Sequence, residues 1–374
     1  MLNNLKVLEL ASVLAGPSVG QFFAELGAEV IKIENLKTGG DITRTWKGVG
    51  EQTDDRSAYF CSVNWGKKSV ALDLSTVEGK TTVKKLAAGT DVVIASYKPG
   101  DAEKLGVSFE QLKALNPTII YGQITGYGSD NDRVGYDAVI QAESGFMDLN
   151  GDQDSPPTKM PVALIDVLAG HQLKEGLLLA LLKRERTGEG SFVEVSLIQT
   201  AISSLTNQAT NWLVAKKLPS RQGSHHPNIA PYGESFLTKD GKRILLAVGS
   251  DRQFFDLLHV LKIDPVAFEQ KFSTNHRRVE NREELGTVLG EKIRQLNASE
   301  LLLKIHQYKI PAGMIQNVRD VFEMNEAKEL LMNSGGITGV RSFVAKAHDD
   351  QLTAGTLSPP PHFGEHTHEV NTFS

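Results

Sequence analysis

One carboxylate stands in an otherwise apolar stretch of the chain, and its surroundings suit it to chemistry. Asp166 follows the apolar run 162–165 and precedes a helix predicted over 167–182, whose charged residues are Lys174 and Glu175. A structural interpretation is a helix N-cap, which accepts hydrogen bonds from the first free N–H groups. The same N–H groups would stabilise a poorly hydrated carboxylate that acts as a nucleophile or a base. The two interpretations are compatible.

A second carboxylate, Asp137, ends a glycine-rich and aromatic loop over 126–137 and precedes a helix predicted over 138–148. Asp137 and Asp166 therefore both lie at helix ends within one α/β segment. The sequence alone does not establish whether they meet in space.

Lysines near the ends of predicted strands are candidates for binding a phosphate. The run 64–69 places Lys67 and Lys68 beside Trp65, which suits a phosphate or an adenine as well as it suits a solvated turn. Open parallel sheets place their ligands at the carboxyl ends of strands. Lys98 and Lys104 follow a strand predicted over 91–95, so they are the better phosphate candidates.

The first residues predict the sheet that would position these groups. A buried strand over 6–10, a helix over 18–26 and a strand over 29–34 form a β-α-β unit, which predicts a parallel, Rossmann-like sheet. The turn AGPSVG lacks the G-x-G-x-x-G spacing that brings backbone close to a pyrophosphate, so NAD binding is not expected. Further elements are predicted as helices over 76–88, with Ser75 as N-cap, and 109–115, and as strands over 118–124 and 192–195.

The pattern changes after residue 224, where hairpin strands at 234–236 and 244–248 and several helices predict a small α+β domain. A connector helix is expected over 197–215, and a helix over 318–332 would lead back to the large domain. The predicted domains are 1–196, the N-terminal part of the large α/β domain, 197–224, the connector, 225–317, the small domain, and 318–374, a return segment that completes the large domain.

Composition narrows the class of protein. The 374 residues include 40 basic and 45 acidic side chains, a net charge of −5, so no nucleic-acid partner is expected. The single cysteine, Cys61, excludes an intrachain disulfide and fits a reducing compartment. The longest unbroken apolar run, 177–182, is too short to span a membrane, and no signal peptide is recognised. We expect a cytoplasmic protein that does not bind a membrane.

Two histidine pairs are candidates for metal ligands. His225 and His226 are adjacent, and His366 and His368 lie near the end of the chain. Neither pair has acidic or cysteine partners at the spacing of zinc or iron sites. We expect turn or cap histidines, and no metal.

The order of motifs resembles that of the class III CoA-transferases, the family that includes formyl-CoA transferase and carnitine CoA-transferase. The resemblance covers most of the chain, and the shared order of the motifs is more specific than any one motif. It is carried by LKVLELASVLAGPSVGQFFAELGAEVIKIE, GGDITR, YFCSVNWGKKSVALDL, SYKPGDAEKLGV, GYDAVIQAESGFMDLNG, ALIDVLAGHQLKEGLLLALLKRERTGEG, HPNIAPY and GEHTHEV.

This resemblance implies coenzyme A as cosubstrate and an acyl-CoA and a small carboxylic acid as partners. It implies that Asp166 attacks the thioester to form a mixed anhydride and then an aspartyl-CoA thioester, with Tyr136 and Asp137 near the reacting centre. The positions that it implies for CoA contacts are Val13, Ala15, Asn64, Trp65, Gly66, Lys67, Ser96, Tyr97, Lys98, Lys104 and Arg133. The turn at Ser96 departs from the family, which often has asparagine there.

Two other functions remain open. The same family includes α-methylacyl-CoA racemase, which uses the aspartate as an acid/base group opposite a histidine; Tyr136 stands at that position here, and a phenol is a poor base near neutral pH. The other alternative is a protein that binds CoA without catalysing a reaction, and it is suggested by the altered turn at Ser96. The resemblance also implies an interlocked homodimer.

Overall fold

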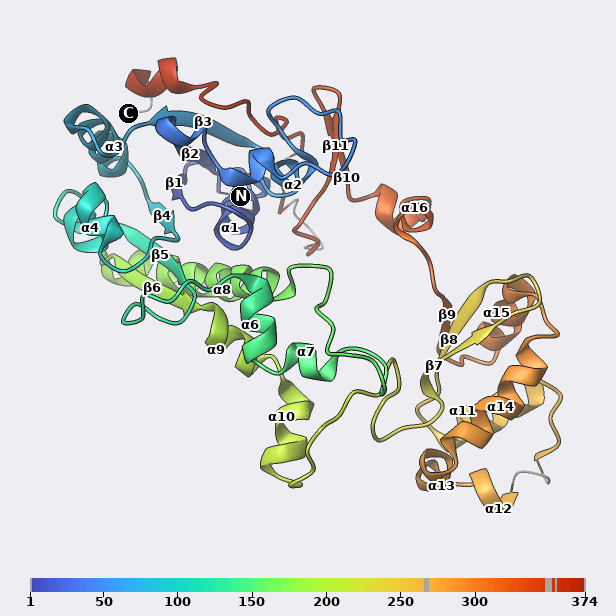
Figure 1. Ribbon diagram of the computed structural model, residues 1–374. Coiled ribbons are helices and arrows are strands. Elements are labelled where there is room, and N and C mark those ends of the chain that lie inside the picture. Colours follow the sequence, from blue (N-terminus) through green and yellow to red (C-terminus); the bar gives the residue numbers. More distant parts are fainter. Residues whose placement is uncertain (1, 266–268, 347–351, 354, 373–374) are drawn as a thin grey trace. The chain divides into compact units, whose positions relative to one another are not determined.

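The computed structural model describes residues 2–265, 269–346, 352–353 and 355–372 (Figure 1). These residues form two compact units, which we call the large unit and the small unit. The large unit comprises Met1–Phe146, Lys159–Thr210 and Lys328–Ser374, and the small unit comprises Met147–Thr158 and Asn211–Ala327. The small unit thus begins earlier than the predicted domain and also includes a segment from the first half of the chain.

The large unit contains a six-stranded sheet in the order β3-β2-β1-β4-β5-β6, and every neighbouring pair is parallel. The strands are β1 (Lys6–Leu10), β2 (Glu29–Asn35), β3 (Lys67–Leu72), β4 (Val92–Ala95), β5 (Ile120–Thr125) and β6 (Ser191–Ser196). This is the strand order of the doubly wound dinucleotide-binding fold, which reverses direction between β1 and β4. The predicted α/β class and Rossmann-like parallel sheet are confirmed.

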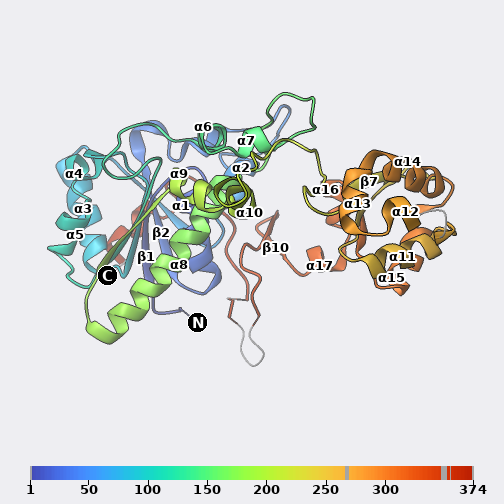
Figure 2. The same ribbon diagram turned by 90° about the horizontal axis from the view of Figure 1, so that it is seen from below.

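Helices cover both faces of this sheet (Figure 2). Apolar side chains of β1 and β4 pack on one face against α1 (Ala15–Glu25) and α8 (Leu164–Thr187), and on the other against α3 (Val77–Ala88) and α5 (Phe109–Lys113). The remaining helices of the large unit are α2 (Ala58–Cys61), α4 (Asp101–Leu105), α6 (Asp137–Glu143), α7 (Phe146–Leu149, at the boundary with the small unit), α9 (Leu197–Ser203) and α10 (Thr206–Leu213, at the second boundary). Short 3-10 helices are η1 (Leu36–Thr38), η2 (Ile42–Thr45) and η4 (Thr367–Thr372).

Helix α8 is longer than predicted and is buried on one side only. Leu173 and Leu177 are fully buried in the core, whereas Leu178, Leu179 and Leu182 are exposed, Leu179 by 68%. A helix that is apolar on both sides is normally covered on both. In the described structure α8 therefore presents an apolar outer face.

Two predicted helices are broken at residues with a left-handed backbone, and a third is replaced by two short helices and a hairpin. The helix expected over 138–148 divides into α6 and α7 at Gly145 (φ 89°), and the connector helix divides into α9 and α10 at Thr206 (φ 45°). The helix expected over 318–332 is wrong: Gly335 and Gly336, both with positive φ, close a hairpin after two short helices. The elements there are α16 (Val318–Val321) and α17 (Asn325–Lys328), followed by β10 (Leu331–Ser334) and β11 (Ile337–Val340).

The last described residues run along β3, the edge strand of the sheet. Ser69 O accepts a hydrogen bond from His366 N at 2.8 Å, and Ala71 N donates to Thr367 Oγ1 at 2.9 Å. Figure 1 shows this C-terminal segment beside β3. These contacts cover the edge that the parallel sheet would otherwise leave open.

The small unit has a three-stranded antiparallel sheet and its own hydrophobic core. Its strands are β7 (Tyr232–Leu237), β8 (Arg243–Ala247) and β9 (Ala312–Met314), and its helices are α11 (Asp251–Val260), α12 (Glu269–Phe272), α13 (Asn275–Glu280), α14 (Arg282–Ile293) and α15 (Ala298–Gln307). The predicted α+β character is thus present, including the hairpin of β7 and β8.

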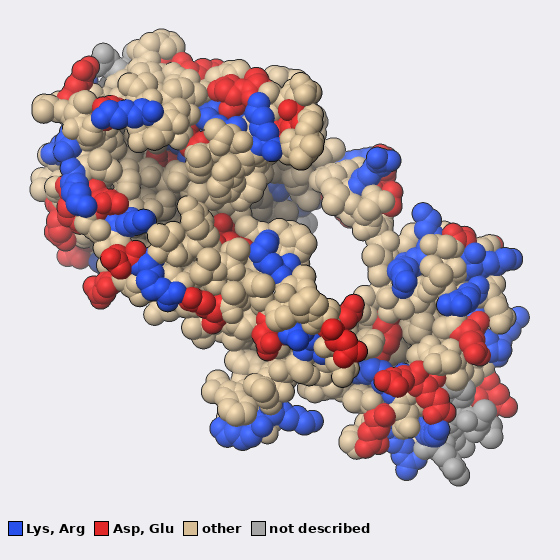
Figure 3. Space-filling view, viewed as in Figure 1, with Lys and Arg blue, Asp and Glu red and all other residues tan. Residues whose placement is uncertain are grey.

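Surface charge is mixed on the face shown in Figure 3, where Lys and Arg side chains alternate with Asp and Glu side chains over each unit. This distribution agrees with the small net charge of −5. Within the described part of the chain, no helix is both long and apolar enough to cross a bilayer.

Candidate active site

Asp166 lies inside the first turn of α8, because the helix begins at Leu164 and Ala163 is its N-cap residue. The interpretation of Asp166 itself as the N-cap is therefore wrong. The capping carboxylate is Asp137, whose Oδ1 accepts hydrogen bonds from Ile165 N at 2.8 Å and from Asp166 N at 3.4 Å. The two carboxylates that the sequence left apart are thus brought together at one helix end.

Asp137 is fixed by a polar contact on its own helix, where it is the first residue of α6. Gln141 Nε2 donates to Asp137 Oδ2 at 2.6 Å, and Gln141 Oε1 accepts from Met160 N at 2.9 Å. One glutamine therefore ties α6 both to the carboxylate and to the segment that leads into α8.

The Asp166 carboxyl is only 8% exposed, and burial raises its pKa to about 7, with the nearby charge of Asp137 as the second cause. Within the described residues, no Lys or Arg forms an ion pair with Asp166. At neutral pH an ionised form is thus available, and it is poorly hydrated. Such a carboxylate is a stronger nucleophile than one in water.

Tyr59 is a residue near this centre that the sequence analysis missed. It lies on α2, half-buried, and its phenol pKa is raised first by burial and then by the charges of Asp166 and Asp137. Its ring meets the ring of Trp46 edge to face at 5.1 Å between centroids. No local pattern signals this approach, because Tyr59 and Asp166 lie in distant segments of the chain.

Tyr136 and Arg133 lie on the loop before α6, and both are exposed. Tyr136 occupies the N-cap position of α6 and is 58% exposed. The Arg133 guanidinium forms an ion pair with Glu143 at 2.5 Å and stacks 4.1 Å from the centre of the Tyr127 ring. Their predicted roles stay predictions.

The turns after β1 and β4 meet where the strand order reverses, the position at which doubly wound sheets bind ligands. Ser12 N donates to Ser96 Oγ at 3.4 Å, which joins the two turns. Val13 has a left-handed backbone (φ 75°), and Ala15 is buried at the start of α1. Several predicted CoA contacts therefore lie at one edge of the sheet.

A cavity of about 460 Å³ opens at this edge. Its lining includes Ser12, Lys32, Asp41 and Tyr97. Lys37 also lines it and was missed by the sequence analysis; its ammonium lies 3.1 Å from Asp73 Oδ2. Lys98 is exposed, and Lys104 is exposed and paired with Asp101 at 3.0 Å, so both ammonium groups are open to solvent.

Of the two interpretations of the run 64–67, the solvated turn is wrong, because Lys67 begins strand β3 and the side chains of Asn64, Trp65 and Lys67 are buried. Lys67 Nζ is bound by Glu9 Oε2 at 2.7 Å, Asn64 Oδ1 at 2.8 Å and Pro17 O at 2.8 Å. The buried ammonium group is thus enclosed by an ion pair and two hydrogen bonds within the protein. A role in CoA contact stays a prediction for this run, and Gly66, with φ 72°, is its most accessible member.

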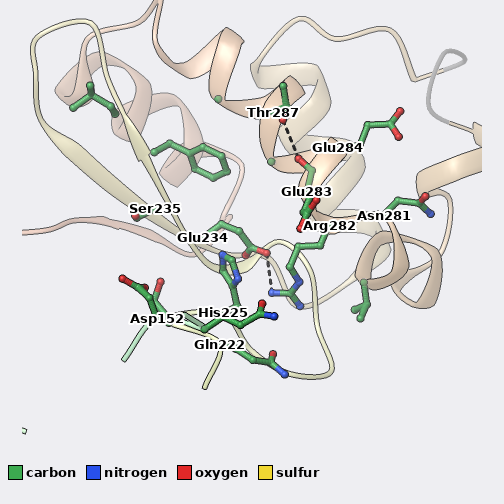
Figure 4. Close-up of a pocket in the computed structure, with 18 of the residues that line it drawn as sticks. Asp152, Gln222, His225, Glu234, Ser235, Asn281, Arg282, Glu283, Glu284 and Thr287 are labelled. Atoms are coloured by element: carbon green, nitrogen blue, oxygen red, sulfur yellow. Dashed lines mark hydrogen bonds and ion pairs between the residues drawn. The ribbon is translucent and has the colours of Figure 1, made fainter. Parts of the chain in front are cut away.

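The small unit contains a larger polar cavity of about 1630 Å³ between β7 and α14 (Figure 4). Glu234 and Arg282 face each other there in an ion pair of 3.0 Å. None of the predicted site residues lines this cavity. The candidate active site is therefore the Asp137–Asp166 pair of the large unit.

The histidines occupy structural positions. His366 Nδ1 accepts from Ser69 N at 3.3 Å, and His226 Nδ1 accepts from Asn228 N at 3.1 Å. Among the described residues, the group with metal-ligand spacing consists of Asp54, Asp55 and His362, all exposed. The absence of a metal stays a prediction.

Comparison with known proteins shows the family of this chain. A sequence profile of CoA-transferase family III matches residues 2–367. The chain is 36% identical over 383 residues to a succinate–glutarate CoA-transferase of Agrobacterium fabrum, with 99% of this chain and 94% of that protein covered. It is 34% identical over 380 residues to the human succinyl-CoA:glutarate CoA-transferase, with 99% and 85% covered.

The crystal structure of a CaiB/BaiF family protein from Brucella suis matches with a TM-score of 0.87 at 38% identity, covering 99% of this chain and 98% of that one. The chain therefore belongs to CoA-transferase family III. The predicted family and the predicted class of enzyme, a CoA-transferase, are confirmed.

Proposed function

We propose that this enzyme transfers CoA between small dicarboxylic acids, with Asp166 as the nucleophile. The supporting observation is the position of Asp166: a buried carboxylate in the first turn of α8, without an ion-pair partner among the described residues, beside a second carboxylate. The names of the relatives support the substrate class, since two that are 34–36% identical act on succinate or succinyl-CoA and glutarate.

The proposed reaction has four steps. Ionised Asp166 attacks the thioester carbonyl and releases CoA thiolate, which leaves a mixed anhydride. The thiolate attacks the aspartyl carbonyl, so the donor leaves as a free carboxylate that carries one oxygen from Asp166. The acceptor carboxylate then opens the aspartyl-CoA thioester, and the thiolate attacks the new acyl carbonyl. This last attack restores Asp166 with one oxygen from the acceptor.

The neighbouring groups have separate roles in this scheme. Asp137 is the proposed positioning residue, since its carboxylate holds the N–H groups of residues 165 and 166. The crevice at the ends of β1 and β4, with Val13, Ala15, Ser96, Tyr97 and Lys98, is the proposed CoA site. Burial of Asp166 keeps water away from the anhydride, which would otherwise hydrolyse.

We also propose that the enzyme is a cytoplasmic homodimer. The exposed leucines of α8 support a partner surface, because such a row of apolar side chains is costly to leave in water.

A transfer assay tests the function. Succinyl-CoA is incubated with a panel of carboxylic acids, and the acyl-CoA products are separated by chromatography. We expect glutarate and similar dicarboxylic acids to accept CoA. Deuterium uptake from D₂O at the α-carbon of a 2-methylacyl-CoA, without any acceptor acid, would instead identify a racemase. CoA binding without product from any acid pair would identify a binding protein.

A further inference from the structure

A buried ion pair lies directly under the turn that follows β1. Lys32, on β2, is 1% exposed, and its ammonium lies 2.9 Å from Asp41 Oδ2 and 2.9 Å from Glu9 Oε1. Its third contact is Ala11 O, at 2.8 Å. One ammonium group therefore joins two buried carboxylates to the backbone at the start of the turn.

Asp41 holds the other end of the same turn. Its carboxylate accepts a hydrogen bond from Val13 N, 3.3 Å from both oxygens, and caps η2 through Thr43 N at 3.0 Å. Burial opposes ionisation of Asp41, but Lys32 and the hydrogen bonds from Thr43 lower its pKa nonetheless. Lys32 and Asp41 thus bind the turn at Ala11 and at Val13.

The turn needs such support, because Val13 has a φ of 75°. Residues branched at Cβ rarely adopt this conformation, and they keep it only where surrounding contacts hold it. The hydrogen bond from Val13 N to Asp41 is a contact of this kind.

The motif GGDITR accounts for the placement of Asp41. Asp41 N donates to Glu34 Oε2 at 2.9 Å, and Glu34 is ion-paired with buried Arg44 at 2.6 Å. A Cβ on Gly40 would lie 2.5 Å from Glu34 Oε2, so only glycine allows this approach. The motif therefore builds the support for a turn that lies thirty residues earlier in the chain.

We propose that Asp41 is a positioning residue for CoA: together with Lys32 it fixes the turn 11–13 in the conformation that receives the cosubstrate. This inference rests on the proposed function, which places CoA at Val13 and Ala15. Asp41 acts through the backbone of Val13, at the edge of the cavity that Asp41, Lys32 and Ser12 line.

The test is the affinity for CoA of Asp41→Asn, which keeps the size of the side chain and one acceptor oxygen but removes the charge that faces Lys32. Isothermal titration calorimetry with CoA measures the Kd, and the transfer assay separates KM from kcat. We expect the Kd and the KM for succinyl-CoA to rise by about tenfold or more. The kcat at saturating succinyl-CoA should fall by a smaller factor.

A double variant separates positioning from general damage. Glycine adopts a φ of 75° without strain. If Asp41 acts by holding Val13, the Asp41→Asn change should raise the Kd by a smaller factor in a Val13→Gly background than in the wild-type background. Equal factors in the two backgrounds would overturn the proposal.

Glu25→Gln is the matched control. Glu25 is also a fully buried carboxylate of the large unit, but it binds Gln21, Ser342 N and Phe343 N and makes no contact with the turn in the described structure. It should lower the melting temperature and leave the Kd for CoA unchanged. A rise in Kd equal to that of Asp41→Asn would contradict the proposal. Failure of the wild type to bind CoA would instead contradict the proposed function.

Discussion

Two groups of buried carboxylates in the large unit have opposite electrostatic surroundings. Glu9 and Asp41 are surrounded by the ammonium groups of Lys32 and Lys67, with contacts of 2.7–2.9 Å. Asp166 is also buried, but its charged neighbour is Asp137, another carboxylate. The first group is compensated and serves the architecture. The second is left without compensation, and this is what makes a carboxylate reactive.

The contrast appears in the pKa values. Burial would raise the pKa of Asp41, but Lys32 and the hydrogen bonds from Thr43 together lower it, whereas burial raises the pKa of Asp166 to about 7. A chain can therefore bury acidic groups without making them reactive, provided that it buries cations with them. The predictions below test whether the two groups differ in this way.

The largest effect is expected for the activity of Asp166→Asn. An amide cannot form the anhydride, so kcat/KM for transfer should fall by about a thousandfold or more. The measurement is the rate of glutaryl-CoA formation from succinyl-CoA and glutarate. Asp130→Asn, at an exposed loop carboxylate, is the control and should keep wild-type activity. A fall of less than tenfold in Asp166→Asn would remove this residue from the chemistry.

Variants of the compensated group should lower the stability of the fold. Lys67→Met removes one of the two buried cations beside Glu9, and it also leaves the acceptors Asn64 Oδ1 and Pro17 O without this donor. The free energy of unfolding should therefore drop by about 3–5 kcal/mol. Urea denaturation followed by circular dichroism measures this drop. Lys346→Met removes an ion pair between exposed residues and should cause no measurable change. Equal midpoints for the two variants would show that burial does not distinguish these pairs.

Asp166→Asn should stabilise the fold above neutral pH. The folded-state pKa of about 7 lies above the ordinary value of 3.8, so between these values the folded state binds more protons than the unfolded state, and stability falls as pH rises. The variant has no carboxylate at this position, so it does not lose this stability. Its free energy of unfolding should exceed that of the wild type by roughly 2–4 kcal/mol at pH 8, and the difference should vanish below pH 4.

Denaturation curves at pH 4, 6 and 8 test this sign. If the wild type gains stability relative to the variant as pH rises, Asp166 is compensated like Asp41. That result would contradict the contrast between the two groups of carboxylates.

The smallest effect concerns Asp137→Asn and the pH dependence of kcat/KM. In the wild type the rate should rise with pH through about 7, since ionised Asp166 is the nucleophile. Removing the charge of Asp137 should move the rise of kcat/KM to lower pH. The pKa that governs this rise should stay above that of an ordinary aspartate, because burial is the larger cause of the raised pKa of Asp166. A rise at the same pH as in the wild type would show that Asp137 does not act on Asp166 through its charge.

Local patterns predicted most of the sheet. The strand over 6–10 matches β1, and the strand over 29–34 differs from β2 by one residue. Buried parallel strands leave a short apolar run between turn signals, which a single sequence shows directly. Helix ends were less predictable: Thr76, and not Ser75, caps α3 through Gly79 N.

The candidate site residues could be named from the sequence, but their geometry could not. Asp166 and Asp137 were both recognised, yet the hydrogen bond from Ile165 N to Asp137 crosses 28 residues, and no periodicity reports it. The approach of Tyr59 and the support of Val13 by Asp41 also join distant segments. The burial of Lys67 was missed for the same reason, because its partner Glu9 lies on another strand.

The central claim is that Asp166 is the nucleophile, and the most direct test traces an oxygen isotope from the acceptor acid to this residue. The enzyme is allowed to turn over succinyl-CoA with glutarate labelled with ¹⁸O in its carboxylates, and the peptide that contains Asp166 is then analysed by mass spectrometry. Since the last step returns an acceptor oxygen to the nucleophile, we predict ¹⁸O in the Asp166 carboxylate. Complete turnover of labelled glutarate with no label at Asp166 would contradict the account.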